Sequence, residues 1–418
     1  MTAEVSPSHI NPAAESAAAD LWQRRLSIGF MNWAHALDHF VILIYPTVVL
    51  QLVVVYGRSY ASLIVLSTAS FVAFGLFSLP AGWLADRWSR RNMMVGFYVG
   101  CGVSLIGAAL SPSLTALAVA LFMLGMFAAI YHPVGMAMLI DVSQARGRTL
   151  AFNGVCGNLG VALAAGISAT LAAWWGWQAA FLAPAVVCFA TGFAFLALVA
   201  DDRHHIGKRK TTAEVTLAPR AMAMMFCCYV VISLAGGLTF NTAQIALPKL
   251  IDERVGQGMA LILIGSLATA IFLCGALAQL AVGRLIERFP PHLLFVGVAT
   301  IQFLGIVAAA YASGAALIAA LAVAMGGIYA QVTVGDIVIA RYTADAWRGR
   351  VYSVRYFLTF ITSGIAVQLI AMLYARGGFD LVLSAIALTG FAMLTAVYTM
   401  AVVVSGAEHA YRAAQPAE

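Results

Sequence analysis

The chain has 418 residues, of which 62% are hydrophobic and only 10% are charged. Soluble domains average about 45–50% apolar and about 25% charged residues, so this composition excludes a soluble enzyme, a disordered chain and a small disulfide scaffold. The formal net charge of +6 does not indicate nucleic-acid binding, because the basic residues lie between apolar runs rather than in one soluble patch.

Apolar runs long enough to cross a bilayer recur along the whole chain. A helix needs about 20 apolar residues to span the hydrocarbon core, and only helices or closed barrels satisfy their backbone groups in lipid. These runs are too long and too uniformly apolar for barrel strands. We therefore predict an all-α integral membrane protein with twelve transmembrane helices at 26–55, 60–84, 93–110, 115–140, 150–173, 178–199, 222–250, 258–285, 292–311, 315–340, 352–374 and 380–404.

The first predicted helix carries a polar stripe. At about 100° per residue, five side chains fall on one face of it: Met31, Asn32, His35, Asp38 and His39. Asp38 follows His35 by three residues, so the two side chains can meet. A charged side chain at the bilayer centre costs about 2.5–3.5 kcal/mol on insertion scales. We therefore expect the stripe to face a cavity or polar partners rather than lipid.

A charged motif follows the second predicted helix. The segment Gly82-Trp83-Leu84-Ala85-Asp86-Arg87-Trp88-Ser89-Arg90-Arg91 resembles the loop signature between helices 2 and 3 of the major facilitator superfamily. The resemblance implies the major facilitator fold, in which helices 1, 4, 7 and 10 line a central cavity, and a gate in which this loop meets helix 11. The alternative is that the arginines only set the topology. The residues we predict for this gate are Gly82, Asp86, Arg87, Arg90 and Arg91.

The two halves of the chain repeat three landmarks at nearly one spacing. Gly82 to Arg87 matches Gly283 to Arg288, the triplet at 146–148 matches that at 348–350, and Pro46 matches Pro248. These matches predict two pseudo-symmetric six-helix bundles, an architecture that alternating-access transporters use. The predicted organisation is a tail at 1–20, a bundle at 21–200, a linker at 201–220, a bundle at 221–404 and a tail at 405–418.

The linker and the basic residues indicate the orientation. The linker holds His204-His205 and Lys208-Arg209-Lys210, which we interpret as a solvated loop rather than a metal site. If both termini are cytoplasmic, all but four of the 23 lysines and arginines fall on the cytoplasmic side. This asymmetry follows the positive-inside rule, so we expect a multi-pass protein of the inner (plasma) membrane with both termini in the cytoplasm.

A narrower resemblance joins the first helix to the fourth and fifth. The stripe with Asp38-His39, the triplet Tyr131-His132-Pro133 and the segment at 157–160 together resemble the fosmidomycin-resistance group, which are proton-driven drug exporters. The resemblance lets His132 approach the stripe of helix 1. A buried acid beside imidazoles, which titrate near pH 6.5 when unperturbed, can exchange a proton at physiological pH.

These patterns give one coupling hypothesis and one structural alternative. We hypothesise that Asp38 with His35 carries the coupling proton, while His39 and His132 tune it or contact the substrate. In the alternative, the four groups form a hydrogen-bond network that only ties helix 1 to helix 4.

The second half offers neutral polar groups. Amides and hydroxyls within the helices can present donors and acceptors to a ligand, or they only bond between helices. We predict a substrate cavity lined by Asn32, Tyr131, Asn241, Gln244, Tyr329 and Gln331. Asp336 is expected to pair with Arg341 or Arg355 at the inner gate. Arginine and lysine are missing at cavity depth, which favours a neutral, zwitterionic or cationic substrate over an anion clamped by arginines.

We expect a monomeric secondary transporter that exports a small amphiphilic, drug-like compound by proton antiport. It is expected to need no cofactor, to bind no resident metal or nucleic acid, and to catalyse no reaction. Two alternatives stay open. Histidine, aspartate and methionine at helical spacing also suit a transporter of transition metals or metal complexes, and a transporter-like receptor would move nothing.

Overall fold

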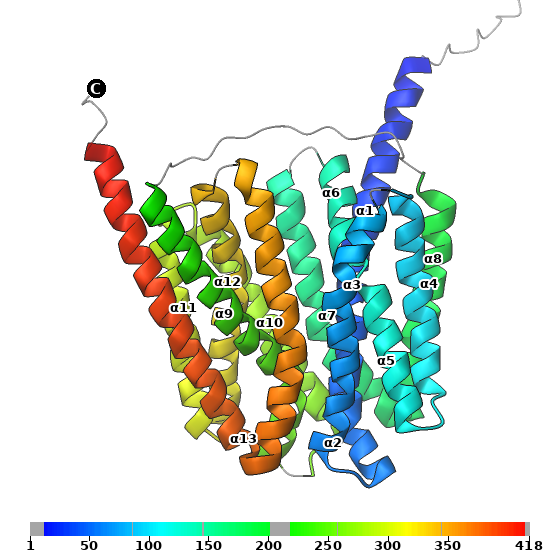
Figure 1. The fold of residues 1–418 in the computed structure, drawn as a ribbon. Helices are drawn as coiled ribbons and strands as arrows, with labels where there is room; N and C mark the ends of the chain where they lie inside the picture. The colour runs from blue at the N-terminus through cyan, green and yellow to red at the C-terminus, as the bar shows by residue number, and fades with distance from the viewer. Residues whose placement is uncertain are drawn as a thin grey trace, which may run out of the picture.

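The computed structural model of the protein describes residues 12–85, 87–143, 146–200, 218–256, 258–343 and 345–413. Within these ranges, helices are the only regular secondary structure. The start of α1 and the end of α13 lie on the same side of the molecule (Figure 1). We call this the terminal side and the other the opposite side.

The first half of the chain occupies one side of the view in Figure 1 and the second half the other. The first half comprises α1 (Pro12–Tyr56), α2 (Tyr60–Ile64), the 3₁₀ turn η1 (Val65–Ser67), α3 (Thr68–Ala85), α4 (Arg90–Ala109), α5 (Leu114–Ala128), the π-helical turn η2 (Tyr131–Gly135), α6 (Met136–Val142), α7 (Arg146–Trp175) and α8 (Ala179–Leu198). The second comprises α9 (Pro219–Arg254), α10 (Leu261–Leu285), α11 (Pro291–Tyr311), α12 (Gly314–Tyr342) and α13 (Asp345–Ala413).

Helix α13 contains two of the predicted membrane spans. Among the described residues, 11 helical stretches are long and apolar enough to cross a membrane, and the last of them runs from Phe357 to His409. That stretch bends at Gly377 and Gly378, and the φ of 60° and ψ of −153° at Gly378 are readily adopted only by glycine. The chain runs to the opposite side and returns (Figure 1). Counting both arms gives the twelve predicted crossings.

Several predicted boundaries were wrong by more than a turn. Helix α1 begins at Pro12 rather than at residue 26, because the Ala-rich segment before Asp20 is a strong helix former and continues the helix. The second predicted helix is divided among α2, η1 and α3, and the fourth among α5, η2 and α6. Two helices that follow short loops begin with a serine N-cap: Ser89 caps α4 and Ser113 caps α5.

Helix α7 lies between α1 of the first half and α10 of the second. A Cβ added to Gly160 would lie 1.9 Å from the carbonyl oxygen of Ala36, so only glycine allows α1 to approach this closely. On the other side, the Gly166 N–H donates to the Thr269 hydroxyl (3.1 Å), which donates to the Ala162 carbonyl (2.6 Å). Small residues and hydroxyls are typical of close contacts between membrane helices.

Replacing Gly160 by alanine should therefore disrupt the protein. The new methyl group meets backbone, which cannot move aside as a side chain does, so we expect a loss of about 3 kcal/mol or more. The yield of monodisperse protein in detergent measures this effect. Gly154→Ala on the same helix is the matched control, because its Cβ would have nothing within 4 Å. Equal yields of the two variants would contradict the packing described here.

Candidate functional site

The polar stripe of α1 is buried inside the first half. Asp38 is fully buried, and only 9% of His35 is exposed. His39 is half-buried. The Nε2 atom of His132 lies 3.5 Å from Oδ2 of Asp38, so the structure joins the stripe to the turn that follows α5. The stripe therefore faces polar partners within the protein, as its composition predicted.

The backbone around His132 is interrupted by the residue that follows it. Pro133 has no N–H, and its ring excludes the carbonyl four residues earlier, so the α-helical hydrogen bonds cannot continue through it. The chain forms the π-helical turn η2 from Tyr131 to Gly135 instead. Such turns are frequent at functional sites. A Cβ on Gly82 of α3 would lie 3.3 Å from Cβ of Pro133, so α3 packs closely against this turn.

Three imidazoles form what we call the imidazole cluster: His35, His39 and His132. Their ring centroids are 5.0, 5.4 and 5.5 Å apart. One nitrogen from each ring lies within 4.8 Å of the others. Two turns of α1 and the π-helical turn η2 thus bring three titratable groups to one point.

Asp38 is the acid of this cluster. Neither carboxylate oxygen has a hydrogen-bond donor, and both are buried. Besides His132, the titratable groups that interact with it electrostatically include Cys101 of α4 and Tyr131 of η2. An ionised carboxylate is very unfavourable in such a place unless a cation or proton compensates it. The acid therefore needs a proton or a cation at short range.

Asn153 of α7 organises the residues around the cluster, and sequence reasoning missed it. Its carbonyl lies 2.8 Å from Nδ1 of His35, and its side-chain amide donates to the side chain of Asn32 at 3.0 Å. The same amide exchanges hydrogen bonds with the Tyr131 hydroxyl at 2.9 and 3.1 Å. Asn153 is fully buried. Its only sequence signal was an amide within a long apolar run.

The contacts of Asn153 correct one predicted pairing. The sequence paired Asp38 with His35 on α1, three residues apart. In the structure His35 bonds to the carbonyl of Asn153, and the imidazole that faces Asp38 is that of His132. Helical spacing permits the first pairing, but the polar carbonyl on α7 holds the His35 ring elsewhere.

Replacing Asn153 by alanine should destabilise the fold around the cluster. The change removes the hydrogen bonds to Asn32 and Tyr131 and leaves their buried polar groups with fewer partners, which costs about 1–3 kcal/mol. Thermal unfolding in detergent measures the loss. The neighbouring Phe152→Ala is the control, because that side chain is 59% exposed. The interpretation fails if both variants unfold at the same temperature.

Two phenylalanines cover His132, and they come from different halves of the chain. Phe74 of α3 and Phe360 of α13 have ring centroids 5.7 and 5.5 Å from that imidazole. They also contact each other at 5.1 Å. Through Phe360, the cluster in the first half touches the second half directly. A movement of α13 would therefore change the environment of His132.

The predicted cavity residues of the second half form hydrogen bonds within α9 and between α9 and the helices α12 and α13. The Asn241 amide donates to the Gly237 carbonyl at 2.8 Å and to the Thr362 hydroxyl at 3.3 Å. The Gln244 amide lies 3.4 Å from the Tyr329 hydroxyl, and the Gln331 amide lies 3.5 Å from the carbonyl of Gly236. All four predicted residues are buried. None of these contacts joins the four residues to the imidazole cluster, whereas Tyr131 stacks on His35 and Asn32 bonds to Asn153.

The predicted gating residues lie at the terminal side. In the first half, Arg90 pairs with Asp141, Arg91 donates to the Leu196 carbonyl, and Arg87 lies over the Trp83 ring at 4.2 Å. Asp86 lies outside the described residues. In the second half, Arg355 pairs with Asp336, one of the two pairings that the sequence suggested. Arg341 instead lies 3.6 Å from Glu408.

Contacts between α3 and α13 continue toward the opposite side, where sequence reasoning had predicted no gate. The Gln368 amide donates to the Thr68 hydroxyl at 2.9 Å. Beyond it, the ring of Tyr60 on α2 contacts that of Tyr374 at 5.0 Å, and Lys249 of α9 lies 5.9 Å from the centre of the Tyr60 ring. The two halves are therefore closed against each other at this side.

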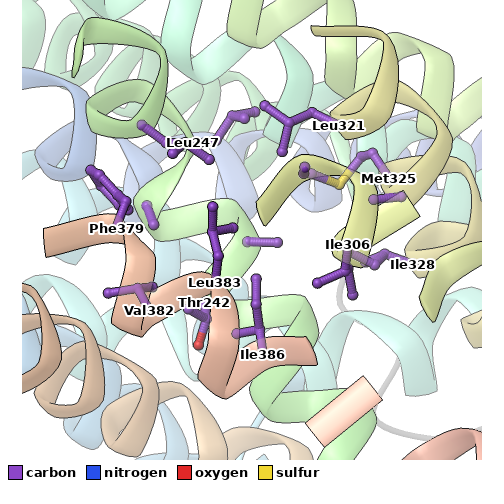
Figure 2. Close-up of a pocket in the computed structure, with 15 residues that line it drawn as sticks. Thr242, Leu247, Ile306, Leu321, Met325, Ile328, Phe379, Val382, Leu383 and Ile386 are labelled. Atoms are coloured by element: carbon purple, nitrogen blue, oxygen red, sulfur yellow. The ribbon is translucent and has the colours of Figure 1, made fainter. Parts of the chain in front are cut away.

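A small pocket lies within the second half, among α9, α11, α12 and α13 (Figure 2). Its walls are aliphatic or aromatic, with Leu247, Leu321 and Leu383 among them. Thr242 supplies the only side-chain hydroxyl of the lining residues, and that hydroxyl has no hydrogen-bond partner. The pocket has no titratable group. We therefore place the candidate site at the imidazole cluster and not here.

The fold defines a polytopic, all-helical membrane protein with two six-helix halves and an acid–imidazole site inside the first. The family model of the Major Facilitator Superfamily matches residues 28–260, which is more than half of the chain. The protein belongs to this superfamily of secondary transporters. No curated protein sequence matches the chain closely enough to count as a relative.

Solved structures support the same fold. A bacterial homologue of the human lysosomal transporter Spinster, in an inward-facing and unoccupied conformation, superposes with a TM-score of 0.72 at 14% identity, over 92% of this chain and 96% of the other. An inward-facing, occupied structure of such a homologue gives a TM-score of 0.72 at 13% identity, over 93% and 97% of the two chains. At this identity the likeness establishes the fold alone.

Proposed function

We propose that the protein is a proton-coupled exporter of a small neutral, zwitterionic or cationic amphiphile. It acts as a monomer in the inner membrane, with both termini in the cytoplasm. The observation that carries the proposal is the fully buried carboxylate of Asp38, which has no hydrogen bond and faces Nε2 of His132 at 3.5 Å. The residues that resemble the fosmidomycin-resistance group include this acid and this imidazole.

Coupling follows from the chemistry of this pair. In one state a proton resides on Asp38 and makes the buried acid neutral. When water reaches the cluster, the proton passes from the Oδ2 atom to the Nε2 atom of His132, directly after a small approach or through one water molecule. This step leaves an Asp38 carboxylate beside a His132 imidazolium, which then releases the proton to water, either directly or by way of His39. Binding of the cargo displaces this proton, so the cargo and the proton are never bound at the same time.

Alternating access links the proton to the cargo. Phe360 of α13 contacts His132, so rocking of the second half uncovers or covers the imidazole. The contacts from Thr68 to Gln368 close the opposite side, which supports a resting state that opens only toward the terminal side. Two discrete arrangements of packed helices are what such a cycle requires.

The charge distribution supports the class of cargo. In the described part of the chain, most lysines and arginines lie near helix ends or at the bend of α13. Of the others, Arg24 and Arg25 precede the polar stripe of α1, and Arg355 is paired with Asp336. A phosphate or dicarboxylate carrier would use arginine forks at cavity depth. An amphiphile with an amine or with no charge suits a cavity that holds one acid and several neutral polar groups.

A resistance and accumulation screen tests this function. Cells that lack the protein and cells that overproduce it are exposed to amphiphilic drugs and to divalent metals at two external pH values. We expect overproduction to lower the accumulation of at least one amphiphilic cation, and the effect to grow as the external pH falls. Unchanged accumulation of every amphiphile, together with altered metal sensitivity, would overturn the proposal in favour of metal transport.

A further inference from the structure

The imidazole cluster brings three possible metal ligands together, with one nitrogen from each ring within 4.8 Å of the others. A small rotation of the rings would place the three nitrogens around one ion. Three imidazoles bonded to one tetrahedral zinc ion at about 2.1 Å place their ring centres about 5 Å apart. The three rings of the cluster are 5.0, 5.4 and 5.5 Å apart. We propose that His35, His39 and His132, with the carboxylate of Asp38, bind one divalent transition cation such as Zn²⁺.

Asp38 is placed as the fourth ligand. Neighbouring ligand atoms around a tetrahedral zinc ion lie about 3.4 Å apart, and Oδ2 of Asp38 is 3.5 Å from Nε2 of His132. Both atoms are buried and have no hydrogen-bond partner. One cation between them would satisfy both and would neutralise a carboxylate that is otherwise costly to bury.

A hydrogen bond to the backbone orients one of the imidazoles in the same way. Histidines that bind metals almost always donate their other ring N–H to a carboxylate, carbonyl or water. Nδ1 of His35 lies 2.8 Å from the carbonyl oxygen of Asn153. That bond fixes the proton on Nδ1 and leaves Nε2 with a free lone pair. Asn153 is therefore an orienting residue for one ligand of the site.

The ligand atoms of the site determine which cation fits it best. Imidazole and carboxylate ligands suit Zn²⁺, Fe²⁺, Co²⁺ and Ni²⁺, whereas Cu(I) prefers thiolate and thioether sulfur. The thioether of Met136 is instead paired with the Tyr131 hydroxyl at 3.9 Å. Ca²⁺ and Mg²⁺ require oxygen ligands. Zn²⁺ is the best fit, and Co²⁺ is its spectroscopic substitute.

The proposed metal site does not depend on the identity of the cargo. Metal ligands must be deprotonated, so binding of the cation expels protons from the same side chains. The cluster then has two mutually exclusive occupants. Metal binding is measured on purified protein in detergent, where no transport takes place. Absence of metal binding and absence of transport are therefore separate results.

The test is a metal titration of the full-length protein in detergent, purified without a polyhistidine tag. His204 and His205 of the linker are replaced by alanine in every sample, so that this adjacent pair cannot bind the added metal. We expect one equivalent of Co²⁺ to produce the visible absorption bands of a tetrahedral site, and one equivalent of Zn²⁺ to abolish them.

Variants locate the bound ion. His39→Ala and His132→Ala should each weaken binding by on the order of 100-fold, as loss of ligand-shell residues does. His409→Ala is the matched control, because this exposed histidine of α13 is not part of the cluster. Size-exclusion profiles verify that each variant is folded. Absence of the cobalt bands in folded protein, or equal binding by His132→Ala and the control, would overturn the proposal.

Discussion

Replacing Asp38 by asparagine is expected to abolish transport driven by a pH gradient while the protein stays folded. Asparagine has nearly the same shape but cannot release a proton, and the site offers no second carboxylate within the contacts described above. Removing an essential proton-transfer group lowers rates by on the order of 100-fold or more. The measurement is uptake of the amphiphilic cation ethidium into inside-out proteoliposomes with an imposed pH gradient.

The matched control for this variant lies on the same helix. Asp20→Asn changes an exposed acid near the start of α1 and should leave the gradient-driven rate unchanged. Counterflow without a gradient separates coupling from binding, because Asp38→Asn should still exchange labelled for unlabelled cargo. Gradient-driven uptake by Asp38→Asn at the rate of the native protein would contradict the coupling role of this acid.

A covalent link between α3 and α13 is expected to stop transport reversibly. Thr68 and Gln368 touch across the two halves at 2.9 Å, so cysteines at both positions can be joined by a short bifunctional thiol reagent. If the halves must part here in each cycle, the linked protein should transport at less than about a tenth of its initial rate. A reductant that cleaves the reagent should restore the rate.

The native cysteines define the background for this experiment. All six cysteines are free thiols, and Cys227 and Cys274 are exposed, so both are replaced by serine first. Thr68→Cys alone, treated with the same reagent, controls for modification of one side. Full transport by a protein that is shown to be linked would contradict alternating access through this interface.

Much of this fold was predictable from composition and pattern. Long apolar runs divided by basic loops define membrane helices, because lipid tolerates neither charge nor unpaired backbone groups. The stripe of α1 was predictable for the same reason: Asp38 in the middle of a span must have a polar environment. The bend at Gly377 and Gly378 was also visible as a break between two apolar runs.

The partners of the site were not predictable from the sequence. Helical spacing allows His35 to contact Asp38, and only the position of the Asn153 carbonyl on α7 shows that the His35 ring bonds there instead. Asn153 carried no more signal than other amides within apolar runs. Phe74 and Phe360 are two of many phenylalanines, and their contact with His132 depends on how α3 and α13 cross. Such contacts depend on tertiary packing and not on local spacing.

The central claim is that binding of the cargo displaces a proton from the buried acid Asp38. The most direct test is to count the protons that are released when the cargo binds. Ethidium is mixed with purified protein in weakly buffered detergent solution, and a pH-indicating dye reports the protons released. We expect proton release from the native protein and from Asp20→Asn, and none from Asp38→Asn although ethidium still binds. Equal release from Asp38→Asn and the native protein would contradict the central role of Asp38.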